Sequence, residues 1–198
     1  MFHVKHAQLL DVLSWVGVEP PPGLFDALSR FEAWLASEGA EAGGIGPAEL
    51  PGLWERHVLD ALMFAVGAES PRSIVDLGSG VGLPGIPLAL LFPEADVLLV
   101  DRSGRRMRLA RRAARVCGAT NVEAIEASFE GLDHRGADLV VMRASLPPDE
   151  ALAVLEAHRA EGGRAVLGVG VRRPEGLDCV RFPGSGILDP GRWLHIMR

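Results

Sequence analysis

Val75-Asp76-Leu77-Gly78-Ser79-Gly80-Val81-Gly82-Leu83-Pro84-Gly85 is the stretch that decides the fold. It follows a short apolar run and precedes an apolar segment, 85–91, with the pattern of a helix. Glycines at 78, 80 and 82 let the backbone turn sharply and approach a ligand closely, because no Cβ intervenes. A glycine-rich turn between a strand and a helix is typical of the crevice in which open α/β sheets bind ligands.

Downstream of this turn, apolar runs alternate with helical patterns. Such alternation predicts a mostly parallel sheet with right-handed crossovers and helices on both faces. The expected strands are 73–76, 97–101, 122–127, 137–142 and 164–169, and the expected helices are 85–91, 105–116 and 148–158. Two last strands, 178–182 and 193–197, predict a C-terminal β-hairpin with a linker rich in Gly and Pro at 183–191.

Upstream of the turn, apolar residues recur at helical spacing. Helices are expected at 7–15, 24–35 and 53–66, with a glycine-rich loop at 38–51. His3, Lys5 and His6 form either a basic arm or a disordered end. We therefore predict an N-terminal helical extension, 1–68, packed on a ligand-binding domain, 69–198.

Composition narrows the classes of function. A net charge of −6 counts against extended nucleic-acid binding but allows a local basic patch. The two cysteines, Cys117 and Cys179, lie far apart and predict neither a disulfide nor a metal site. No apolar run is long enough for a bilayer, and the first residues lack the core of a secretory signal. The expected compartment is the cytoplasm.

The glycines also fit the dinucleotide pattern G-x-G-x-x-G, at residues 80, 82 and 85. Two features favour S-adenosylmethionine instead, which has no phosphate and carries positive charge. Asp76 is an acid placed for a cationic ligand, and Pro84 removes a backbone N–H that a phosphate would use. Asp101 ends the next strand, where a carboxylate can bond ribose hydroxyls. A nicotinamide or flavin, or a turn kept only for packing, are the alternatives.

By its motifs, the chain resembles the glucose-inhibited division protein B family, the small-subunit ribosomal RNA methyltransferases G. The matching segments are 2–6, Arg56-His57-Val58-Leu59-Asp60-Ala61-Leu62, 75–87, 101–106 and Arg143-Ala144. The resemblance implies a Rossmann-like class I methyltransferase fold. It also implies S-adenosylmethionine-dependent methylation of guanine N7 in small-subunit (16S) ribosomal RNA.

The resemblance also assigns residues. It implies that the cofactor contacts Gly78, Leu83, Phe129, Glu130 and Arg143, while Asp101 holds the ribose. Guanine N7 has a free lone pair and no proton to lose, so no general base is expected and catalysis rests on positioning.

Arg143, Arg56 and His57 are the candidate positioning residues. Arg143 suits a base edge or the cofactor, the alternative being a charge pair with Asp76 or Asp138. Arg56 and His57 either line the mouth of the site or are a surface arginine and a packed histidine. Asp60, one turn further, is expected to pair with either.

An arginine-rich helix is the candidate phosphate-binding element. This strongly charged helix is expected to start at Ser103 and carries six arginines in eleven residues, 105–115, and a solvated amphipathic helix is the alternative. The expected partner is small-subunit ribosomal RNA or the ribosomal subunit, and the expected state is a monomer without metal. The candidate RNA-binding residues are Arg102, Arg105, Arg106, Arg108 and Arg112.

Three segments depart from the usual family pattern. Gly43-Gly44-Ile45-Gly46 stands where members usually carry Asn-Leu-Thr, and Arg143-Ala144-Ser145-Leu146 replaces Arg-Ala-Phe-Ala. Only residues 171–176 separate the fifth expected strand from the next one, so the usual crossover helix is expected to be missing. These departures keep two alternatives open: a methyltransferase with another substrate, and a non-catalytic cofactor-binding module.

Overall fold

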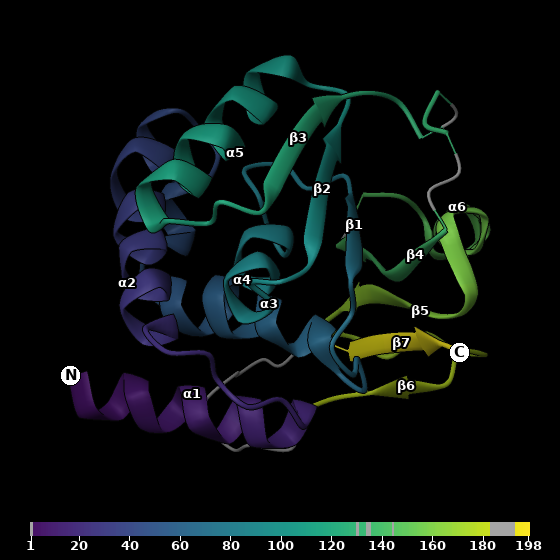
Figure 1. The fold of residues 1–198 in the computed structure, drawn as a ribbon, viewed down its shortest axis with the longest axis horizontal. Helices are drawn as coiled ribbons and strands as arrows, with labels where there is room; N and C mark the ends of the chain where they lie inside the picture. The colour runs from purple at the N-terminus through teal and green to yellow at the C-terminus, as the bar shows by residue number, and fades with distance from the viewer. Residues whose placement is uncertain (1, 130, 134–135, 144, 183–192) are drawn as a thin grey trace.

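The centre of the molecule is a β-sheet with the strand order β3-β2-β1-β4-β5-β7-β6 (Figure 1). This computed structural model describes residues 2–129, 131–133, 136–143, 145–182 and 193–198. Within them the strands are β1 (Ser73–Leu77), β2 (Asp96–Asp101), β3 (Val122–Glu126), β4 (Ala137–Arg143), β5 (Arg159–Gly170), β6 (Cys179–Val180) and β7 (Trp193–Met197). The mostly parallel sheet confirms the predicted fold class.

Strands β1 to β5 pair in parallel, and the crossover connections that this requires place helices on both faces of the sheet. Val75 lies opposite Leu98 of β2 and Val140 of β4. Successive residues of β1 point to opposite faces, so Ile74 and Val75 belong to two different apolar clusters.

Helices cover the sheet on both sides. Figure 1 shows α2 (Leu24–Trp34), α4 (Gly85–Leu91) and α5 (Gly104–Cys117) on one side, and α6 (Pro148–His158) on the other. The Ser103 side chain caps α5 by accepting a hydrogen bond from the backbone N–H of Arg106. Helix α5 ends at Gly118, whose φ of 85° is left-handed. The crossover helices agree with the sequence prediction.

The C-terminal strands form the predicted hairpin. β7 pairs antiparallel with both β5 and β6, so it lies between them. β6 is shorter than the expected strand 178–182. Residues 171–178, between β5 and β6, contain no helix, which confirms that the crossover helix is missing. The predicted linker 183–191 lies outside the described residues.

The N-terminal region is helical, as predicted, but its first helix starts earlier. α1 (Phe2–Val16) includes His3, Lys5 and His6, so the expectation of an arm or a disordered end is wrong. Lys5 Nζ lies 2.8 Å from Glu32 Oε1 of α2, and this ion pair holds the first turns on the neighbouring helix. None of the helices in the described residues is long and apolar enough to cross a membrane.

The segment between α2 and β1 is made of short turns. They are the π-helical η1 (Leu35–Gly39) and η3 (Trp54–Leu59), the 3₁₀ turns η2 (Pro47–Glu49) and η4 (Met63–Ala65), and α3 (Asp60–Leu62). Thus the expected loop 38–51 contains the end of η1 and all of η2, and the expected third helix is present in three pieces. The apolar cluster of this region continues into α4, α5 and the sheet.

Candidate active site

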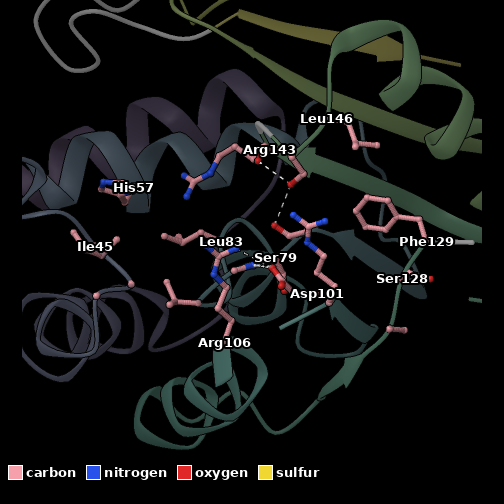
Figure 2. Close-up of a pocket in the computed structure, with 18 of the residues that line it drawn as sticks. Ile45, His57, Ser79, Leu83, Asp101, Arg106, Ser128, Phe129, Arg143 and Leu146 are labelled. Atoms are coloured by element: carbon pink, nitrogen blue, oxygen red, sulfur yellow. Dashed lines mark hydrogen bonds and ion pairs between the residues drawn. The ribbon is translucent and has the colours of Figure 1, made fainter. Parts of the chain in front are cut away.

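A cavity of about 670 Å³ lies at the carboxyl ends of the parallel strands (Figure 2). It brings together candidate residues from η3, the turn after β1, the end of β2 and the end of β4, which are far apart in the sequence. The predicted residues that line it are His57, Gly78, Gly80, Leu83, Asp101, Arg102, Arg106, Phe129 and Arg143. Glu130 lies outside the described residues.

The glycine turn forms the floor of this cavity. The backbone N–H groups of Gly78 and Ser79 both donate to the carbonyl of Val100, at 2.8 and 3.1 Å, which ties the turn to β2. Gly78 has a φ of 77°, and a Cβ there would overlap the side chain of Ser145. Ser145 Oγ in turn donates to the Gly78 carbonyl at 3.2 Å. Glycine is therefore required at 78 for conformation and for space.

Asp101 connects the turn to helix α5. Its Oδ2 accepts from the Gly80 N–H at 3.1 Å, and its Oδ1 accepts from the Ser103 N–H at 2.9 Å. Arg106 Nη1 lies 3.6 Å from the same Oδ2. A carboxylate has about four acceptor positions, so Asp101 can still accept hydrogen bonds from a ligand in the cavity.

Asp76 does not lie where the sequence suggests. It is fully buried beneath the turn, and its Oδ2 accepts from the Gly85 N–H at 2.7 Å. It is absent from the residues that line the cavity. The reason is its depth along the strand: Asp76 lies inside β1, opposite Leu99 and beneath the start of α4, whereas Asp101 is the last residue of β2. Its direct contact with a cationic ligand therefore stays a prediction that this geometry does not support.

Burial raises the pKa of Asp76 to about 7, although the Gly85 N–H and the charge of Arg143 oppose the rise. Its Oδ1 has no hydrogen-bond partner among the described residues. A carboxyl in this setting favours its neutral form, because a buried charge without enough donors is costly.

We expect the Asp76→Asn variant to lose a pH dependence of stability. An unfolded Asp76 titrates near 3.8, whereas the folded one titrates near 7. Between these values the folded state holds the extra proton, so its free energy of unfolding falls as pH rises, by up to about 1.4 kcal/mol per unit. Urea unfolding at several pH values measures the slope. Asp96→Asn, at an exposed carboxyl of β2, is the matched control; equal slopes in Asp76→Asn and the unmodified chain would contradict the prediction.

Gly82 also lies outside the cavity lining. Its φ is 101°, and a Cβ there would overlap Ile86 of α4. Its role is close packing of the turn against the helix. Its assignment to cofactor binding stays a prediction.

Arg143 enters the cavity from the end of β4, and its Nη1 lies 3.4 Å from Oδ2 of Asp60. Both side chains are largely buried, at 13% and 4% exposure. Asp60 is a partner for Arg143 that the sequence does not predict. Asp138, one of the expected partners, accepts instead from the backbone N–H groups of Arg72 and Ser73.

His57 and Arg56 are neighbours in η3 but face different surroundings. His57 is buried, and its Nε2 lies 3.2 Å from Oε2 of Glu49. Arg56 is exposed and is not part of the cavity lining. Successive residues of η3 point in different directions, and here the side chain of His57 is turned inward while that of Arg56 is turned to solvent. The interpretation of Arg56 as a surface residue fits this geometry better.

The arginines after Asp101 divide into groups. Arg102 and Arg106 line the main cavity, and together with Arg105 they line an adjacent hollow of about 380 Å³. Arg105 Nη2 donates to the Ala42 carbonyl at 2.6 Å, and Arg112 Nε donates to Glu38 Oε2 at 3.0 Å. Arg108 is exposed and lines neither hollow. In the part of the chain that the structure describes, no His, Cys, Asp or Glu side chains gather into a possible metal site.

Several residues that line the cavity were not predicted from the sequence. The high glycine content of 43–46 was the available signal, because glycine permits close approach of two backbones. The structure shows such an approach: a Cβ at Gly44 would overlap Val81 of the glycine turn. The short polar Ser145, two positions after Arg143, was a weaker clue. The additional lining residues are Gly43, Gly44, Ile45, Glu49, Ser79, Val81, Ala127, Ser128, Ser145 and Leu146.

Solved structures show the same fold. A precorrin-6y C5,15-methyltransferase of Geobacter metallireducens has a TM-score of 0.53 at 15% identity, covering 70% of this chain and 86% of its own. A ribosomal protein L11 methylase of Lactobacillus delbrueckii has a TM-score of 0.53 at 19% identity, covering 72% and 78%. At this identity the likeness concerns the fold alone, and it agrees with a Rossmann-like methyltransferase architecture.

Sequence comparison gives the family. The family model described as GidB, rRNA small subunit methyltransferase G, matches residues 25–175. The ribosomal RNA small subunit methyltransferase G of Frankia casuarinae is 32% identical over 190 residues, 86% of this chain and 72% of the relative. That of Kineococcus radiotolerans is 39% identical over 125 residues, 62% of this chain and 49% of the relative. The chain thus spans between 49% and 72% of the length of these two relatives. It belongs to the GidB family of rRNA small subunit methyltransferases G.

Proposed function

We propose that this protein transfers a methyl group from S-adenosylmethionine to guanine N7 of small-subunit ribosomal RNA. The observation that carries the proposal is the cavity on the glycine turn, which joins Asp101 and Arg143 in a chain of this family. The activity of the family supports the reaction. The proposed compartment is the cytoplasm, where ribosomal RNA is found, and the monomeric state stays a prediction.

The residues present fit S-adenosylmethionine. The turn lets a ligand approach the backbone at Gly78 and Gly80, and Asp101 has acceptor capacity for ribose hydroxyls. Ser79 Oγ is buried beside the cavity and has no hydrogen-bond partner among the described residues, so a polar group of a ligand would satisfy it. Phe129 offers apolar surface for the adenine ring, and Leu83 offers apolar surface for another part of the cofactor.

The chemistry asks little of the protein beyond position. Bound S-adenosylmethionine supplies a methyl group that is attached to a positively charged sulfur. When the methyl group is transferred, the rest of the cofactor leaves as a neutral thioether. Guanine N7 attacks with its own lone pair and releases no proton, so the reaction needs no general base. Arg143 and His57 border the cavity, where they would orient the base and exclude water.

An RNA partner is supported by the local charge. The chain as a whole is acidic, with a net charge of −6. However, Arg102, Arg105 and Arg106 gather at a hollow that shares Asp101 with the main cavity. Guanidinium groups bind phosphates well, so this hollow is the proposed contact for the RNA backbone beside the reacting base. Roles of Arg108 and Arg112 in RNA binding stay predictions.

One observation favours a second candidate, a methyltransferase acting on a different substrate. Residues 171–178 form no helix, so the surface beyond β5 differs from that expected of the family. The cavity itself is complete without that helix, because its lining comes from other elements. We therefore favour the ribosomal substrate.

Small ribosomal subunits that lack N7 methylation, incubated with radiolabelled S-adenosylmethionine and this protein, test the proposal. We expect label in one guanine, at N7, and none in large subunits treated in the same way. Label at another atom or in another RNA would support the second candidate. Cofactor binding by calorimetry without any transfer would overturn the proposed ribosomal activity and favour a non-catalytic cofactor-binding role.

A further inference from the structure

The carboxylates that line the main cavity differ in how they are engaged. Among the residues that the structure describes, they are Asp101 and Glu49. Asp101 is 5% exposed, and both of its oxygens accept backbone N–H groups. The Glu49 side chain is 48% exposed, and its Oε2 lies 3.2 Å from Nε2 of His57. Of these two carboxylates, Glu49 is the one that is open to a ligand.

Glu49 lies on the side of the cavity away from the proposed adenine position. Figure 2 shows His57 across the cavity from Phe129, with Arg143 on the His57 side of the view. Glu49 ends η2, and its Oε2 is 3.2 Å from His57 Nε2, so it belongs to the His57 side. A cofactor with its adenine at Phe129 and its ribose at Asp101 leaves this side for the base that is methylated.

Guanine presents two kinds of edge to such a site. N7 and O6 are acceptors on one edge, whereas N1–H and the N2 amino group are adjacent donors on the opposite edge. When N7 faces the methyl group, the two donors point away from the cofactor. An ionised carboxylate is acceptor-only and can take both donors at once, in a paired geometry.

We propose that Glu49 selects guanine by accepting hydrogen bonds from its N1–H and N2 amino groups, and that His57 holds Glu49 in place. This inference rests on the proposed function. Arg143, on the same side of the cavity, is placed to donate to O6 without blocking N7. Adenine would meet this pair with the wrong polarity, because its N6 amino group would face Arg143 and its unprotonated N1 would face Glu49.

The test compares guanosine with inosine, which lacks only the N2 amino group, at the nucleotide that the unmodified enzyme methylates. Small subunits reconstituted with either nucleotide are the substrates. We expect the unmodified enzyme to lose about 10- to 100-fold in kcat/KM on inosine, the usual effect of one hydrogen bond to a charged group. In Glu49→Gln, we expect a similar loss on guanosine and a guanosine-to-inosine ratio close to one.

Two controls separate a loss of guanine selection from a general effect of charge and from a loss of cofactor binding. Glu41→Gln changes an exposed carboxylate just outside the cavity lining, and it should keep both the rate and the ratio. Calorimetry should find the same affinity for S-adenosylmethionine in Glu49→Gln as in the unmodified enzyme. A weakened affinity would place Glu49 at the cofactor instead and overturn the inference, as would an unchanged ratio in Glu49→Gln. An unmodified enzyme inactive on guanosine RNA would overturn the proposed function, and this inference with it.

His57 is a positioning residue in this scheme, since it acts through Glu49. His57→Ala should lower the guanosine-to-inosine ratio, while His57→Gln, whose amide nitrogen can replace Nε2, should restore most of it. Loss of folding alone would reduce both rates and leave the ratio unchanged. Equal ratios in all three proteins would exclude this role for His57.

Discussion

Replacing Arg143 with alanine is expected to slow methyl transfer by about 100-fold or more, the usual cost of misplacing a reacting group. The guanidinium of Arg143 enters the cavity from the rigid end of β4 and lies 3.4 Å from the buried Asp60. This contact fixes the direction of the planar guanidinium. Lysine has no planar group and cannot reproduce this arrangement. Arg143→Lys should therefore recover only a small part of the rate. Single-turnover rates at saturating S-adenosylmethionine measure the effect.

Arg115→Ala provides the matched control for this prediction. Arg115 is an exposed arginine in the last turn of α5 and lines neither hollow. Its replacement removes the same charge from the protein without touching the cavity, and the rate should stay within about twofold. An Arg143→Ala enzyme as fast as the Arg115→Ala enzyme would show that Arg143 does not position the base.

Gly78→Ala is expected to lower the free energy of unfolding by roughly 2–5 kcal/mol. Two costs add at this position. The φ of 77° is unfavourable for any residue with a Cβ, and the new methyl group would overlap Ser145. The turn can relieve the overlap only by moving, which would also weaken S-adenosylmethionine binding at least about tenfold. Urea unfolding and calorimetry measure the two effects.

Gly80→Ala separates conformation from crowding. Gly80 also has a positive φ, of 58°, but a Cβ there meets no atom within 4 Å. It should therefore lose only the conformational part, roughly 1–2 kcal/mol. Adding Ser145→Gly to Gly78→Ala should recover part of the stability by removing the crowded side chain. Equal losses in the two single alanine variants would contradict the role given to Ser145.

The sequence predicted the sheet well because its strands are buried on both faces and appear as short apolar runs between helices. The turn 78–82 and Asp101 were placed correctly at the carboxyl ends of the strands for the same reason. The sequence could not distinguish Asp76 from Asp101 as cavity residues. Both side chains point to the same face of the sheet, because Asp76 lies opposite Leu99. The difference depends on how far along its strand each residue lies: Asp101 ends β2, whereas Asp76 lies inside β1 and is covered by the start of α4.

The parts of the site contributed by the N-terminal region were harder to predict. Glu49 lies in a short 3₁₀ turn inside what the sequence presents as a loop. Its approach to His57 depends on how the π-helical η3 folds back, which no local pattern encodes. The ion pair of Arg143 with Asp60 joins residues on different elements and likewise requires the tertiary structure.

The carboxylate of Asp101 bonds the glycine turn through one oxygen and the start of α5 through the other. The same two segments carry the proposed cofactor floor and the arginines of the adjacent hollow. A ligand that shifts either segment therefore changes the free energy of binding at the other. Thermodynamic linkage makes this coupling reciprocal: if S-adenosylmethionine tightens RNA binding by some factor, RNA tightens S-adenosylmethionine binding by the same factor.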